Sequence, residues 1–94
     1  MFNIAIDNNG NIRLSGRFDA TQADKATQIF DTIQTTATVY FDNLEYISSA
    51  GLSVLLKTQK RLMVDGRELI LKNMNRHISE VFRYAGFDML FKIE

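Results

Sequence analysis

Residues 39–56 read VYFDNLEYISSAGLSVLL and indicate a strand that leads into a helix. Residues 37–41 are rich in β-branched and aromatic side chains, which is typical of a strand in the middle of a sheet. Residues 42–47 read as a polar connection that carries a few apolar anchors. From about residue 49 onward the apolar positions follow a helical spacing, so we expect a helix that continues to about Asp65.

The two faces of that helix follow from its spacing. Lys57, Lys60 and Arg61 lie on the polar side, and such a group of charges is usually a solvated helix face, although it can also dock a partner. The apolar side, which we expect to face the sheet, comprises Leu52, Leu55, Leu56, Leu62 and Met63.

The start of the chain predicts a β-hairpin. Apolar and polar residues alternate over residues 2–6 and again over residues 11–15. The Asn-Asn-Gly sequence at residues 8–10 tolerates the positive φ angles of a tight turn. We therefore expect two antiparallel strands at the N-terminus.

The remaining elements alternate between helix and strand. Asp19 is a candidate N-cap, with Gln22 placed as in a capping box, and one apolar stripe then predicts a helix to about residue 34. The C-terminal part predicts, in order, a strand over residues 68–72, a helix over residues 78–85 and a last strand over residues 89–93.

The order β-β-α-β-α-β-α-β indicates an α/β fold. We expect a mixed sheet that opens with the antiparallel hairpin, continues with parallel crossovers and packs its helices against the strands. A chain of 94 residues, 46% of them hydrophobic, predicts one domain over residues 1–94. The formal net charge of zero argues against binding to nucleic acid. The apolar runs are too short for insertion into a membrane, so a cytoplasmic protein is expected.

The sequence offers little for catalysis or metal binding. His77 is the one histidine, and a place in a solvated loop or first helical turn explains it best. There is no cysteine, no Gly-x-Ser-x-Gly motif and no glycine-rich phosphate loop. We therefore expect no enzyme activity, no catalytic residue, no metal site and no cofactor.

Two serines stand where the main helix begins. Ser48 or Ser49 can act as the helix N-cap. A helix start is also a favourable place for a phosphoserine, because the unpaired amides and the helix dipole accept negative charge, and Gly51 would leave the backbone open to close approach. The residues alone favour the two interpretations about equally.

Three separated stretches resemble the STAS domain family, which is named for sulphate transporters and anti-sigma factor antagonists. They are LSGRFD at residues 14–19, VYFDNL with ISSAGL at residues 39–44 and 47–52, and VFRYAGFDMLF at residues 81–91. The resemblance spans nearly the whole chain, and its middle motif is the most specific. It implies a STAS-like fold and a stand-alone anti-sigma factor antagonist.

The resemblance also implies a phosphorylation switch at Ser49. In the antagonists of this family the phosphorylated serine lies two residues before the glycine of the switch loop, which here is Gly51. The family's implied partners are an anti-sigma factor that is also a serine kinase and a serine phosphatase that reverses the modification. The better-known members have aspartate before the phosphoserine, where this chain has Ser48, and Ser48 is our second choice. The switch loop and partner-binding residues are then Asp19, Ser48, Ser49, Ala50, Gly51 and Leu52.

Two other functions remain as alternatives. Some short STAS proteins are accessory subunits of membrane ABC transporters, in which case Ser49 would be an unmodified contact residue. A small hydrolase using Ser49 lacks a nearby histidine and an elbow motif. We expect a monomer or a weak dimer that acts as a protein-binding module in partner switching.

Overall fold

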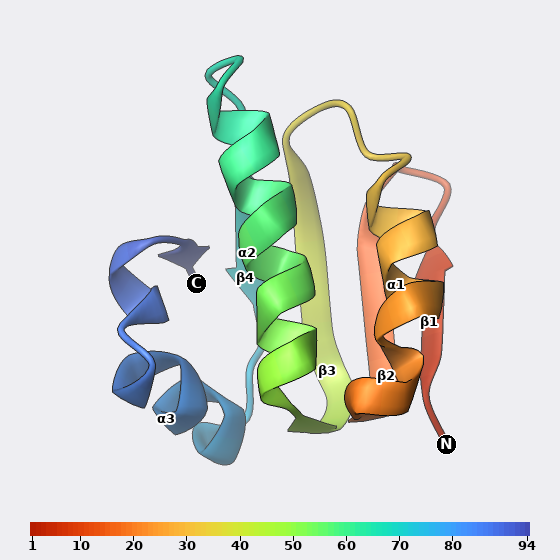
Figure 1. Cartoon of the computed structure of the whole chain (residues 1–94), viewed down its shortest axis with the longest axis vertical. Coiled ribbons are helices and arrows are strands. Elements are labelled where there is room, and N and C mark those ends of the chain that lie inside the picture. The colour runs from red at the N-terminus through yellow and green to blue at the C-terminus, as the bar shows by residue number, and fades with distance from the viewer.

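A computed structural model of residues 1–94 shows a five-stranded sheet. Two helices lie across one face of the sheet, and the third lies to one side of them (Figure 1). The strands, in the spatial order β1-β2-β3-β4-β5, are β1 (Asn3–Ile6), β2 (Ile12–Phe18), β3 (Ala37–Ile47), β4 (Leu69–Lys72) and β5 (Lys92–Ile93). The helices are α1 (Ala23–Phe30), α2 (Ser49–Met63) and α3 (Arg76–Tyr84), with short 3-10 helices η1 (Ala20–Gln22) and η2 (Phe87–Met89). None of the helices has the length and apolar character needed to cross a bilayer.

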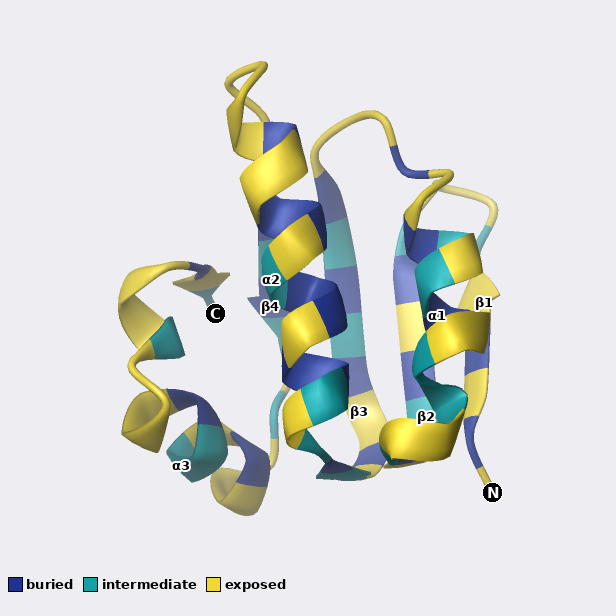
Figure 2. Ribbon diagram, in the orientation of Figure 1, coloured by how far each residue is buried: buried dark blue, intermediate teal, exposed yellow.

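The sheet is mixed, as predicted. Strands β1 and β2 are antiparallel, and every other neighbouring pair is parallel. Helices α1 and α2 lie side by side against the sheet (Figure 1). The residues they turn toward it are buried, whereas their outer sides are exposed (Figure 2). The predicted α/β class and the order of its elements are confirmed.

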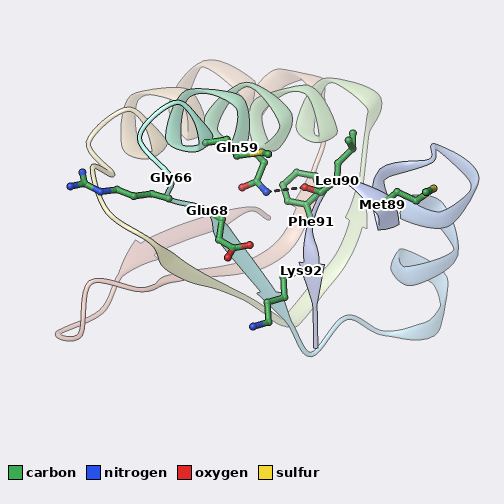
Figure 3. A pocket seen from close by; sticks show the side chains of 9 residues that line it. Gln59, Gly66, Glu68, Met89, Leu90, Phe91 and Lys92 are labelled. Carbon is green, nitrogen blue, oxygen red and sulfur yellow. Dashed lines mark hydrogen bonds between the residues drawn. The ribbon is translucent and has the colours of Figure 1, made fainter.

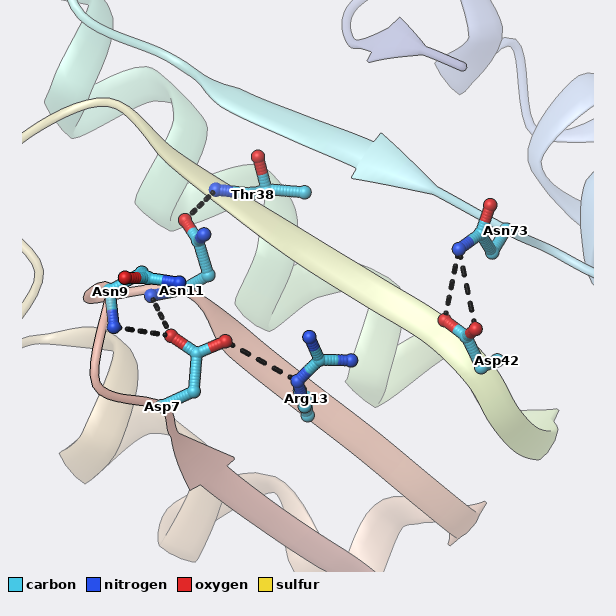
Figure 4. Close-up of polar contacts among 7 residues, drawn as sticks. All are labelled: Asp7, Asn9, Asn11, Arg13, Thr38, Asp42 and Asn73. Atoms are coloured by element: carbon cyan, nitrogen blue, oxygen red, sulfur yellow. Dashed lines mark hydrogen bonds and ion pairs between the residues drawn. The ribbon is translucent and has the colours of Figure 1, made fainter.

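The N-terminal hairpin is confirmed together with its turn. Asn3 pairs with Ser15, and Ile6 pairs with Ile12. In the turn the Asp7 carboxylate accepts hydrogen bonds from the amides of Asn9 and Asn11 at 2.9 and 3.0 Å (Figure 4). These amides, that of Asn11 foremost, hold the pKa of Asp7 below its usual value.

The polar connection predicted for residues 42–47 is wrong, because β3 continues to Ile47. The alternation of buried and exposed side chains is interrupted in this part of β3. The reason is that β3 pairs with the shorter strand β2 through two register shifts. One shift lies beside Gly16, whose φ is +80° and whose added Cβ would lie 1.5 Å from the Met1 carbonyl oxygen. Leu44 and Ile47 still face the core, so the extra residues bulge outward while the strand stays paired. β2 correspondingly runs past residue 15 to Phe18.

Helix α1 is shorter than predicted at both ends. Asp19 caps the 3-10 helix η1 by accepting from the Thr21 amide at 3.0 Å, and Gln22 makes no reciprocal bond of a capping box. The helix ends at Phe30, and Arg61 of α2 donates hydrogen bonds to the carbonyl oxygens of Phe30 and Ile33 at 3.0 and 2.8 Å. Arg61 therefore binds two carbonyl oxygens at and just after the end of α1 instead of simply extending into solvent.

Two further expectations need correction at the C-terminal side. Helix α2 ends at Met63, whose side chain is 58% exposed and does not face the sheet. Leu56, also predicted to face the sheet, is only half-buried. The last strand is limited to β5, since residues 87–89 form η2. An aromatic cluster replaces the missing strand contacts, with Phe82 of α3 lying 5.8 Å from Phe41 and 6.0 Å from Phe91 between ring centroids.

Candidate functional site

The predicted switch loop lies where the parallel strands β2 and β3 end side by side and α2 begins. Phe18 pairs with Ile47, the last residues of the two strands. The Ser48 amide then donates to the Phe18 carbonyl oxygen at 2.9 Å. This bond brings Asp19, the next residue of the chain, to the same edge of the sheet as Ser48 and Ser49.

Ser48 is the N-cap of α2. Its backbone is extended, with φ −87° and ψ 169°, and its hydroxyl oxygen accepts a hydrogen bond from the Gly51 amide at 3.1 Å. Its carbonyl oxygen accepts the first intrahelical bond, from Leu52, at 2.9 Å. The capping interpretation left open by the sequence therefore belongs to Ser48, which is half-buried.

Ser49 is the first residue of α2, and its side chain is exposed. Its amide and that of Ala50 have no acceptor within the helix, because they belong to the first turn. That turn contains no acidic side chain. A negatively charged group on Ser49 would therefore lie beside free N–H groups at the positive end of the helix dipole.

Gly51 was expected to leave the backbone open to close approach, but in the structure it packs against the core. It is buried, and an added Cβ would lie 2.9 Å from Cγ1 of Ile47 and 3.1 Å from Cγ of Phe18. The missing side chain thus lets the start of α2 pack closely on the ends of β2 and β3. Leu52 continues this contact as a core residue, so Gly51 and Leu52 support the loop and Ser49 presents a side chain to solvent.

An exposed stripe of α2 begins at Ser49. Ser53, Lys57 and Lys60 follow at helical intervals and are all exposed. The two lysines were predicted to lie on the polar side of the helix, whereas Ser53 was not; its spacing of four residues from Ser49 places it on the same face. Arg61, grouped with the lysines, is occupied by its hydrogen bonds to Phe30, the last residue of α1, and to Ile33.

The remaining polar candidates do not converge on the switch loop. His77 lies in the first turn of α3, where it is exposed. Asp42 accepts hydrogen bonds from the Asn73 side chain at 3.2 and 3.3 Å (Figure 4). No three His, Cys, Asp or Glu side chains are grouped so that they could hold a metal ion. The geometry of the loop is that of an exposed hydroxyl on a rigid, packed helix start.

Comparisons with known proteins agree with this architecture. A family model described as Mlab, STAS domain matches residues 4–92. BtrV of Bordetella bronchiseptica, a provisionally named anti-sigma factor antagonist, is 34% identical over 79 residues, which are 84% of this chain and 67% of that protein.

Solved structures share the fold at low sequence identity. The anti-sigma factor antagonist SpoIIAA matches in its unphosphorylated form with a TM-score of 0.74 and 17% identity, over 100% of this chain and 87% of that chain. The phosphorylated form of SpoIIAA from Bacillus matches with a TM-score of 0.72 and 18% identity, over 100% of this chain and 91% of that chain. A provisionally named anti-sigma factor antagonist from Thermotoga maritima matches with a TM-score of 0.80 and 18% identity, over 99% of this chain and 85% of that chain. With a family model that covers residues 4–92 and a fold to match, this chain belongs to the STAS domain family.

Proposed function

We propose that the protein is an anti-sigma factor antagonist that phosphorylation of Ser49 switches between binding states. The names of BtrV and SpoIIAA support the antagonist function, and the two forms of SpoIIAA support the switch. In this proposal the protein is a binding module in the cytoplasm rather than an enzyme. Its partners are an anti-sigma factor with serine kinase activity and a serine phosphatase.

The observation that carries the proposal is that the two serine side chains differ in hydrogen bonding and in exposure. The Ser48 hydroxyl is tied to the Gly51 amide, and it is half-buried. The Ser49 hydroxyl is exposed at the first position of the same helix. A kinase can therefore reach Ser49 without opening the helix, whereas transfer to Ser48 would remove its cap.

Phosphorylation at this position changes the docking surface without unfolding it. The added group brings a charge of about −1.5 to −2 at neutral pH, and the free amides of Ser49 and Ala50 can accept it. In a protein interface that has no cation opposite, the same charge costs several kcal/mol of binding free energy. Since 1.4 kcal/mol is about tenfold in affinity, one phosphate is enough to release a partner.

The test is phosphorylation by the serine kinase-type anti-sigma factor encoded in the same genome. With ATP it should add one phosphate, which peptide mass spectrometry should locate at Ser49. Ser49→Ala should bind the kinase but remain unmodified, and Ser49→Asp should bind at least tenfold more weakly. Ser48→Ala is the matched control and should still be modified at Ser49.

Two results would contradict the proposal. Modification confined to Ser48 would show that the helix start opens for the kinase. A stable complex with a transporter subunit, combined with an unmodified Ser49 and no affinity for the anti-sigma factor, would favour the accessory-subunit function instead.

A further inference from the structure

Exposed apolar side chains gather at the end of α2 that lies away from the switch loop. Met63 and Val64 are 58% and 84% exposed, and Met89 and Leu90 beside η2 are 88% and 46% exposed. A hollow of about 390 Å³ lies here, and its lining includes Met63, Met89 and Leu90 (Figure 3). We call these four residues the apolar end. Clustered apolar exposure of this kind commonly marks an interaction surface, whereas single exposed residues do not.

Hydrogen bonds of a buried side chain hold one wall of the hollow in place. Because β5 pairs only with Ile70 and Leu71 of β4, the start of β4 is paired with β3 on one side and has no strand on the β5 side. The Gln59 side chain fills this position. It donates to the Leu90 carbonyl oxygen at 2.8 Å (Figure 3) and accepts from the Leu69 amide at 2.7 Å. Gln59 is 3% exposed, so these bonds fix the chain around Leu90 against α2. The apolar end therefore keeps its shape without a partner.

The charges around the apolar end are balanced in sign. Lys60 and Asp65 flank it along the chain, and Arg67, Glu68 and Lys92 line the hollow. Lys92 is paired with Glu94, whereas the other four charges are free of ion pairs, although Arg67 donates a hydrogen bond to a carbonyl oxygen. A strongly acidic or basic partner would meet like charges here. A surface with an apolar centre and two free charges of each sign is complementary to itself instead.

We propose that the apolar end is the interface of a weak, two-fold symmetric dimer of this chain. Two copies would bury Met63, Val64, Met89 and Leu90 against one another, and the free charges at the rim would face charges of opposite sign. The methionines suit this contact, because their flexible side chains adapt to an irregular surface such as the hollow. An interface of this size is expected to be transient rather than obligate.

The dimer would leave the switch loop accessible. Ser49 and Met63 lie at opposite ends of the fifteen-residue helix α2, which separates them by roughly 20 Å at 1.5 Å per residue. The inference does not depend on phosphorylation of Ser49. Ser49→Asp is accordingly expected to dimerise like the native protein.

The test measures association with two independent readouts. In analytical ultracentrifugation the weight-average mass should rise from 10.8 kDa toward twice that value between about 5 and 500 µM. In the same range, the methyl NMR signals of Met63 and Met89 should shift, and those of Met1 and Met74 should not.

Variants identify the surface. Met89→Asp and Val64→Asp should each abolish the mass increase, because a carboxylate would be buried without a partner. Tyr84→Asp is the matched control, since Tyr84 is 79% exposed but lies outside the apolar end, and it should associate normally. A constant mass of one chain up to 500 µM with unshifted Met63 and Met89 signals would overturn the proposal. So would association that both apolar-end variants retain.

Discussion

Replacing Gln59 by leucine should strongly destabilise the protein although it places an apolar residue in an apolar helix face. The substitution removes the two hydrogen bonds to Leu69 and Leu90 and leaves their backbone groups without partners. Leu69 is fully buried, so its N–H group cannot turn to water. An unsatisfied buried group costs about 1–3 kcal/mol. The Leu90 carbonyl lies nearer the surface and should cost less, so we expect a total loss of about 2–4 kcal/mol.

This loss is measurable by urea unfolding followed by circular dichroism. With a slope of about 1.5 kcal/mol per molar urea, the midpoint should fall by roughly 1.3–2.7 M. Hydrogen exchange provides a local readout, in which the Leu69 amide should lose protection. Gln28→Leu is the control, because Gln28 is exposed on α1 and makes no such bonds, and it should change stability by less than about 0.5 kcal/mol. An equally small effect of Gln59→Leu would refute the claim that this side chain replaces strand pairing at the start of β4.

Three further predictions concern the core, the helix pair and the hairpin turn. Leu55→Ala should cost about 2–5 kcal/mol of unfolding free energy, and Lys60→Ala should cost little; similar small values would mean that α2 is rotated. Arg61→Ala should cost about 1–2 kcal/mol in urea unfolding, and Arg61→Lys should not restore it, because one ammonium replaces a guanidinium that reaches two carbonyls. The Asn11 amide and other donors lower the pKa of Asp7, so its contribution is present above about pH 4 and is lost as the pH falls further. Asp7→Ala should therefore weaken the acid dependence of the urea midpoint below pH 4, and an unchanged dependence would exclude this role.

The hairpin and the alternating order could be predicted because their signals are local. The period of two over β1 and β2 and the Asn-Asn-Gly turn act within about fifteen residues of chain. The length of β3 could not be predicted in the same way. Its polar residues 42, 43 and 45 fit a connection until the pairing with β2 is known. Only that pairing shows that Asn43 lies opposite Ser15 in a continuous strand and that residues 42 and 45 lie at the two register shifts.

Long-range contacts account for the other differences. Met63 fits the apolar spacing of α2, but β5 is too short to cover that end of the sheet, so nothing packs over it. Gln59 occupies a core position of the helix, four residues after Leu55 and three before Leu62. A polar residue in that spacing signals a buried hydrogen-bonded side chain, although its partners cannot be identified from the sequence.

The proposed switch gives the two adjacent serines of the candidate site separate tasks. Ser48 caps α2, so Ser48→Ala should cost about 0.5–2 kcal/mol of unfolding free energy while phosphorylation at Ser49 continues. Ser49 makes no capping bond, so Ser49→Ala should leave stability within about 0.5 kcal/mol and abolish phosphorylation. Thermal unfolding and mass spectrometry on both variants would measure the two effects separately. Loss of both properties in one variant, with neither lost in the other, would show that one serine carries out both tasks and would refute this division.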